Sequence, residues 1–189
     1  MIYDQEGGTC AGFAIANAIE HVTGKIPKSS EVYNLYEEYD EGPQGMRLTE
    51  VMELLEIHPW AGVKVKDHIE IWHILKRKLF PNPMGKIREY LLKQKQGWGV
   101  VVAIRIREGK PQFPLDENGV LKPRTTRVKD VHAVFLAGIR KNLLFLENSW
   151  GSDFGQLGYF YLRVDDLSAE VHSIYAIQFD HDGSSKPKG

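Results

Sequence analysis

The residue with the widest chemical range in this 189-residue chain is its single cysteine, Cys10. A lone cysteine excludes an intramolecular disulfide and a zinc site built from four cysteines. Cys10 follows Gly7 and Gly8 and precedes a stretch rich in alanine, so we expect it in the first turn of a buried helix. Free backbone N–H groups and the helix dipole at that position favour the nucleophilic thiolate. Considered alone, such a cysteine is more often a small buried hydrophobe.

Three further residues carry groups that would complete a nucleophilic site around the thiol. His132 begins an apolar strand, and Asn148 lies at the end of the next strand along the chain. An imidazole can take the thiol proton, and an amide carbonyl can fix the tautomer of that imidazole. Gln5 can direct its side-chain amide to the same point as the Cys10 N–H, so that two donors would hold an oxyanion. Each of these residues also has a purely structural interpretation: a core histidine, a strand end and a helix cap.

The elements that must position these groups change character along the chain. Helical spacing is expected for 10–21, for a helix capped by Ser29 and Ser30, and for 48–55, while 63–72 alternates like a strand. A Pro/Gly connector over 80–85 precedes a short helix from Ile87. The expected strands are Trp98–Ile106, Val131–Ile139, Leu143–Glu147, Tyr159–Val164 and Ser173–Phe179.

This order predicts an α+β fold with two lobes. Residues 1–84 would form a helical lobe that carries the nucleophile, and residues 85–180 an antiparallel, barrel-like β lobe that carries His132 and Asn148. Several strands are apolar at successive positions, as expected for strands buried on both faces. The polar residues 181–189 are expected to form a flexible tail. The site would then lie in the cleft between the lobes.

Three segments together resemble the papain-like cysteine peptidases. They are Asp4-Gln-Glu-Gly-Gly-Thr-Cys-Ala-Gly, Asp130-Val-His-Ala-Val-Phe and Glu147-Asn-Ser-Trp-Gly, and the likeness extends from residue 4 to about residue 164. The resemblance implies that Cys10 is the nucleophile, His132 the base, Asn148 its orienting group and Gln5 an oxyanion donor. It also implies that Trp150 covers the hydrogen bond between Asn148 and His132 and borders the substrate site.

The sequence departs from the family pattern at several points. Gln5 lies one position nearer to the cysteine than in most members, and Ala11 stands where an aromatic residue is usual. The cysteine that normally forms a disulfide just before the nucleophile is absent. By resemblance, Gly45 and Met46 would bind the substrate backbone, and Ala133 would line the neighbouring pocket.

The resemblance implies hydrolysis of peptide or isopeptide bonds through a thioester, with no cofactor and no metal. An acyltransferase using the same thioester and a catalytically inactive binding module on the same fold remain alternatives. The other histidines lack metal-ligand spacing and are expected at the surface.

Composition sets the expected partners and location. A net charge of −1 gives no basic field for nucleic acid, and no apolar run approaches the roughly 20 residues of a membrane span. We therefore expect a peptide or protein substrate, no nucleic-acid or membrane partner, and a monomer. The lack of a signal-peptide pattern and of any disulfide favours a cytoplasmic location.

Overall fold

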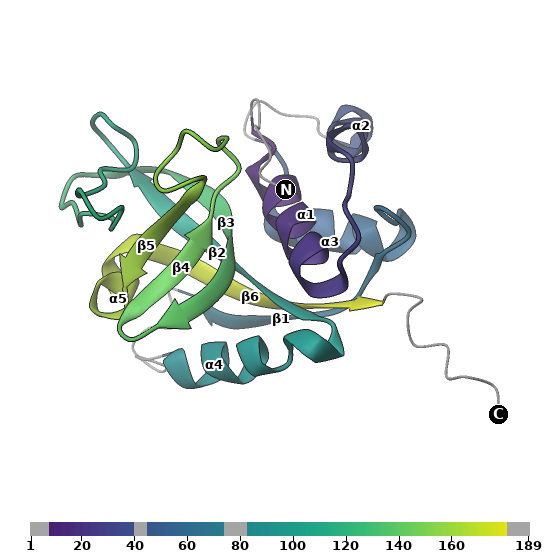
Figure 1. Ribbon diagram of the computed structural model, residues 1–189. Helices are drawn as coiled ribbons and strands as arrows, with labels where there is room; N and C mark the ends of the chain where they lie inside the picture. Colours follow the sequence, from purple (N-terminus) through teal and green to yellow (C-terminus); the bar gives the residue numbers. More distant parts are fainter. Residues whose placement is uncertain (1–7, 40–44, 74–82, 181–189) are drawn as a thin grey trace.

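The computed structural model describes residues 8–39, 45–73 and 83–180 of the chain (Figure 1). Three helices come first and one follows the first strand: α1 (Cys10–Thr23), α2 (Ser29–Tyr39), α3 (Leu48–Ile57) and α4 (Met84–Leu92), with the short α5 (Leu167–Glu170) near the end. The strands are β1 (Lys64–His73), β2 (Trp98–Arg107), β3 (Val128–Arg140), β4 (Leu143–Glu147), β5 (Tyr159–Arg163) and β6 (Val171–Asp180). The mixed helix and strand content expected from the sequence is therefore present.

All six strands form one antiparallel sheet in the order β1-β6-β2-β3-β4-β5. The sheet is open, so the expectation of a barrel-like lobe is wrong. Its two edge strands do not pair with each other, because the outer edge of β5 is taken by backbone hydrogen bonds between Tyr161 and both Gly119 and Leu121. Strand β1, from the predominantly helical first half of the chain, forms the opposite edge through its pairing with β6.

The central strands are buried on both faces, as their apolar sequences predict. In β2, Val101 and Ala103 join the core packed against α1, whereas Val100, Val102 and Ile104 join a second core on the opposite face. The second core is closed by α4 and by residues of the 108–127 segment. Figure 1 shows α1 and α4 on different sides of the sheet. The sheet is therefore a rigid layer between two cores, and it fixes where β3 and β4 end.

Element boundaries differ from the sequence prediction by a few residues. Helix α4 begins at Met84, inside the expected connector, with Pro83 at its N-cap, where the missing proline N–H costs nothing. Strand β3 begins three residues before the expected Val131, because Val128 and Asp130 still pair with β2. The expected Gln5 site and the 181–189 tail lie outside the described residues.

Helices α1 and α2 approach each other closely at Gly12. A Cβ atom there would lie 2.7 Å from Cγ1 of Val32 and 2.9 Å from Cε2 of Tyr36, and the Tyr36 hydroxyl accepts the Gly12 N–H at 3.1 Å. The side chains that would collide are buried in the core. Only a residue without a side chain lets the nucleophile helix sit this close to α2.

We expect Gly12→Ala to lower the free energy of unfolding by about 1–2 kcal/mol, because the clash outweighs the better helix propensity of alanine. Urea titration measures the change. Gly85→Ala in α4 is the matched control, since its Cβ would meet nothing within 4 Å. That variant should gain roughly 0.5–1 kcal/mol. Equal effects of the two substitutions would show that α1 and α2 are not tightly packed at Gly12.

Candidate active site

Cys10 is the first residue of α1 and is partly exposed. The backbone N–H groups of Ala133, Ala11 and Cys10 itself act to lower the pKa of its thiol. Burial raises the pKa of the thiol more than these donors lower it, and the Asp130 carboxylate raises the pKa further. The structure therefore favours a neutral thiol at rest, held against β3 beside the residue that follows His132.

His132 and Asn148 are joined by a short hydrogen bond. His132 Nε2 lies 2.7 Å from Asn148 Oδ1, and the Ser149 N–H donates to the same oxygen at 2.9 Å. An oxygen that already receives a backbone N–H is an acceptor, so the imidazole donates from Nε2. In the neutral ring Nδ1 then carries a lone pair. Asn148 is fully buried and fixes this tautomer from the end of β4.

Aromatic rings enclose the imidazole. The Trp150 ring lies 4.6 Å from the His132 ring between centroids, and the Phe113 ring lies 5.6 Å from it. Burial lowers the pKa of His132 to about 4, although the Asn148 hydrogen bond and Asp130 raise it. The ring is thus neutral in the folded protein. Because its folded pKa lies below the ordinary 6.5, this histidine removes stability as the pH falls from about 6.5 towards 4.

A cleft of about 520 Å³ opens in front of Cys10. Gly8, Gly45, Met46 and Ala133 are among the residues that line it. Gly45 has φ +70°, and a Cβ atom on it would collide with the Gly8 carbonyl. The structure thus brings Cys10, Gly45, Met46 and Ala133 to one cleft and places His132, Asn148 and Trp150 in a cluster beside it.

Several polar cleft residues were not identified from the sequence. Asp130, Ser173, Tyr175, His73 and His172 all line the cleft. His73 and His172 were expected at the surface, but their rings meet at 4.7 Å between centroids because β1 pairs with β6. Asp130 could have been identified from the sequence, because it precedes His132 by two positions on the same strand. The histidine pair had no local signal, since its members are far apart in sequence.

A second buried acid lies next to Asn148. Glu147 is only 6% exposed, and burial raises the pKa of its carboxyl to about 7, although a hydrogen bond from Tyr159 lowers it. Glu20 of α1 raises that pKa as well. Desolvation also raises the pKa of Tyr159 to about 12. The strand that presents Asn148 therefore carries an ionisable group that holds its proton at mildly acid pH.

Glu147→Gln is expected to raise the free energy of unfolding, and the increase should be about 1–2 kcal/mol larger at pH 8 than at pH 5. The folded pKa lies above the ordinary 4.5, so the wild-type carboxyl costs stability as the pH rises through 7, whereas glutamine does not titrate. Urea unfolding at both pH values measures this difference. Glu53→Gln on the exposed face of α3 controls for loss of a surface carboxylate. A pH-independent effect of Glu147→Gln would contradict the assignment.

Two features are absent from the described residues. No group of three or more His, Cys, Asp or Glu side chains in the described ranges is arranged to hold a metal ion. Within the same ranges, every helix is too short or too polar to cross a membrane.

Comparison with known proteins gives structural likeness without sequence likeness. No family model and no curated protein matches the chain. Xylellain, a cysteine protease from Xylella fastidiosa, matches 94% of this chain and 82% of its own at 16% identity, with a TM-score of 0.68. The Carica candamarcensis cysteine protease CMS1MS2, in complex with E-64, matches 93% and 90% at 17% identity, with a TM-score of 0.64.

A third structure is the proform of the ragweed cysteine protease Amb a 11. It covers 100% of this chain and 59% of its own length at 18% identity, with a TM-score of 0.61. All three likenesses extend over most of the described chain, so they concern the whole arrangement of helices and sheet. The chain therefore has the fold of the papain-like cysteine proteases.

Proposed function

We propose that this protein is a papain-like cysteine peptidase that hydrolyses peptide or isopeptide bonds with Cys10, His132 and Asn148. The observation that carries the proposal is the short hydrogen bond between His132 and Asn148, on a strand that borders the cleft at Cys10. His132 donates Nε2–H to Asn148 at 2.7 Å, and the next residue on the strand, Ala133, lines the same cleft as Cys10. Nucleophile, base and orienting group then follow one another from α1 to β3 to the end of β4.

In the proposed reaction, His132 Nδ1 accepts the Cys10 proton as the sulfur attacks the substrate carbonyl carbon. The tetrahedral oxyanion is held by the Cys10 N–H and by the Gln5 side chain. Collapse breaks the C–N bond, and His132 returns the proton to the leaving amine. Water, deprotonated by the same imidazole, then hydrolyses the thioester and frees Cys10.

The Cys10 thiol and the His132 imidazole are both neutral before the reaction, so Asn148 must stabilise the imidazolium that forms. Burial disfavours the imidazolium that forms with the thiolate, and the Asn148 carbonyl is the contact that favours it. Asp130, which raises the pKa of both partners, also favours the imidazolium but opposes the thiolate. The ion pair is therefore expected to form as the substrate carbonyl arrives, when the developing charge gains the oxyanion donors.

Covalent labelling tests the proposal directly. A thiol-directed epoxide should modify Cys10 near neutral pH, and His132→Ala should slow the labelling about 100-fold because the imidazole no longer accepts the thiol proton. Intact-protein mass spectrometry against time measures the rate, and His21→Ala is the control, since this exposed histidine lies at the other end of α1. Equal labelling of wild type and His132→Ala would identify an ordinary thiol and a catalytically inactive module.

The acyl acceptor is tested separately. With a peptide substrate and a large excess of added primary amine, we expect free acid as the main product by mass spectrometry. Predominant amine adducts would replace the peptidase assignment by an acyltransferase that uses the same thioester.

A further inference from the structure

The outer face of the β4–β5 hairpin carries a row of aromatic side chains that no core covers. The register pairs Glu147 with Tyr159 and Phe145 with Tyr161, so these side chains share one face. The Phe145 and Tyr159 rings are stacked at 4.7 Å and 3°, and the Tyr161 ring lies 5.2 Å from Phe145. We call Phe145, Tyr159 and Tyr161 the aromatic row. It leads away from Asn148 on the face of the sheet that also packs against α1, and none of its residues lines the cleft at Cys10.

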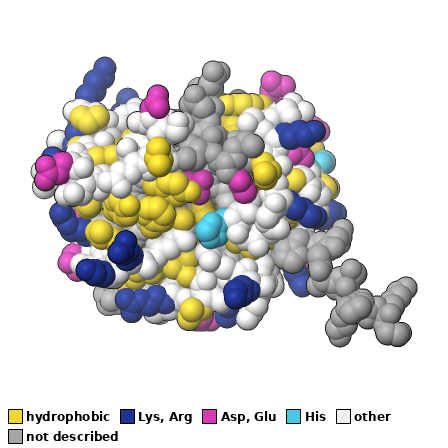
Figure 2. Space-filling view, in the orientation of Figure 1, with side chains coloured by type: hydrophobic (Ala, Val, Ile, Leu, Met, Phe, Trp, Pro, Cys, Tyr) yellow, Lys and Arg dark blue, Asp and Glu magenta, His cyan; other side chains and the backbone are white. Residues whose placement is uncertain are grey.

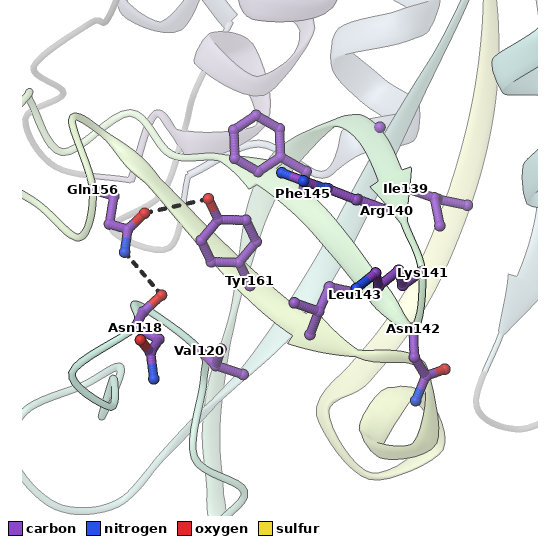
Figure 3. Close-up of a pocket in the computed structure, with 11 residues that line it drawn as sticks. Asn118, Val120, Ile139, Arg140, Lys141, Asn142, Leu143, Phe145, Gln156 and Tyr161 are labelled. Carbon is purple, nitrogen blue, oxygen red and sulfur yellow. Dashed lines mark hydrogen bonds between the residues drawn. The ribbon is translucent and has the colours of Figure 1, made fainter.

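A cavity of about 770 Å³ lies against this row (Figure 3). Phe145 and Tyr161 form its apolar part together with Val120 and Leu143, and Asn118 and Gln156 supply amides. Tyr161 donates its hydroxyl to the Gln156 side chain, and Gln156 donates to the Asn118 backbone carbonyl, so the Gln156 amide is held in place. The cavity therefore joins flat aromatic surface to preoriented hydrogen-bonding groups.

The rim of this cavity is positively charged. Arg140 and Lys141, at the β3–β4 turn, line it, and the Arg140 side chain extends toward Phe145 in Figure 3. A smaller adjoining pocket shares Lys141 and adds Arg88. Within the described ranges, no acidic side chain lines either pocket, and neither Arg140 nor Lys141 forms an ion pair. Figure 2 shows Lys and Arg side chains bordering a hydrophobic area on this side of the molecule.

One carboxylate near the cavity, that of Asp165, accepts a hydrogen bond from the lining residue Asn142 at 2.9 Å. Asp116 and Asp166 each lie 3.9 Å from Arg163, which reduces the free charge on that side of β5. The sheet edge is closed as well, since Gly119 and Leu121 occupy the backbone groups of Tyr161. A partner must therefore bind through side chains, with negative charge beside Arg140 and Lys141 and an apolar group on the aromatic row.

We propose that this face docks an acidic peptide segment that carries an aromatic or large aliphatic side chain. Carboxylates of the segment pair with Arg140 and Lys141, and its apolar side chain lies on Phe145 and Tyr161 while the fixed Gln156 amide bonds its backbone. A sulfated polysaccharide would fit less well, because it needs a denser array of cations and gains nothing from the aromatic row. No residue lines both this cavity and the cleft at Cys10, so the docking face and the cleft are distinct.

Fluorescence anisotropy with a short labelled peptide, a phenylalanine flanked by glutamates, tests the proposal. Binding at low salt should weaken about tenfold in Arg140→Glu/Lys141→Glu and about tenfold in Tyr161→Thr. Lys64→Glu/Lys66→Glu on β1 makes the same change in net charge at two exposed positions and should leave the affinity unchanged. Thermal unfolding of each variant confirms that the fold is retained.

Three results would overturn the proposal. The first is that Arg140→Glu/Lys141→Glu binds the peptide with the same affinity as the control Lys64→Glu/Lys66→Glu, and the second is that a peptide with glutamines in place of the glutamates binds as well as the original. The third is that a sulfated polysaccharide displaces the peptide while Tyr161→Thr has no effect on peptide binding. Protein with alkylated Cys10 should bind the peptide as well as untreated protein does. Loss of binding on alkylation would place the peptide in the cleft instead. Because peptide binding is measured without catalytic turnover, this experiment tests the docking proposal independently of the peptidase assignment.

Discussion

Cys10→Ala is expected to lower kcat for peptide hydrolysis by at least about 10⁴-fold. The sulfur is the atom that would form the thioester, and with a single cysteine in the chain no second thiol can replace it. Residual activity should reflect binding and oxyanion stabilisation alone. Initial rates on a fluorogenic peptide, with the protein concentration set by absorbance, give the ratio.

The structure suggests that this substitution leaves the fold intact, which makes the result interpretable. Alanine retains the Cβ of Cys10, and the site borders an open cleft. The melting temperature of Cys10→Ala should therefore stay close to that of the wild type. Retention of more than about a tenth of the wild-type kcat by a folded Cys10→Ala protein would rule out thiol catalysis and with it the proposed function.

His132→Ala is expected to lower kcat by about 10³–10⁴-fold, because the neutral thiol then lacks the base that accepts its proton. Burial already raises the pKa of Cys10, so the thiolate fraction without the imidazole is small at neutral pH. The residual rate of His132→Ala should consequently rise with pH as hydroxide replaces the base. Rates between pH 6 and pH 9 measure this slope.

Asn148→Ala separates orientation from proton transfer. The imidazole remains, but it loses the 2.7 Å contact that fixes its tautomer, and the Ser149 N–H loses its acceptor. We expect a smaller fall in kcat, about 10–100-fold, without the steep pH dependence of His132→Ala. If Asn148→Ala matched the wild type at every pH, Asn148 would have no role in positioning His132.

Some features of the molecule follow from local sequence. Cys10 begins a helix because glycines precede a run of small apolar residues in the sequence, and β4 spans the expected Leu143–Glu147. Asn148 therefore comes at a strand end, and it lies within hydrogen-bonding reach of His132 because β3 and β4 are adjacent antiparallel strands. Chain-local signals suffice for these features, since both helix starts and strand alternation are decided over a few residues.

Other features exist only in three dimensions. The sheet stays open because the backbone of Gly119 and Leu121 takes the edge of β5, a long-range pairing that no periodicity encodes. His73 meets His172 in the cleft only because β1 joins β6.

The sequence by itself determined which residue types could form a thiol site and the order of the elements that carry them. The tertiary structure alone decided the burial that keeps Cys10 and His132 neutral and the cationic rim beside the aromatic row. The physical reason is that a side chain's type is local, whereas desolvation and charge proximity depend on every segment packed around it.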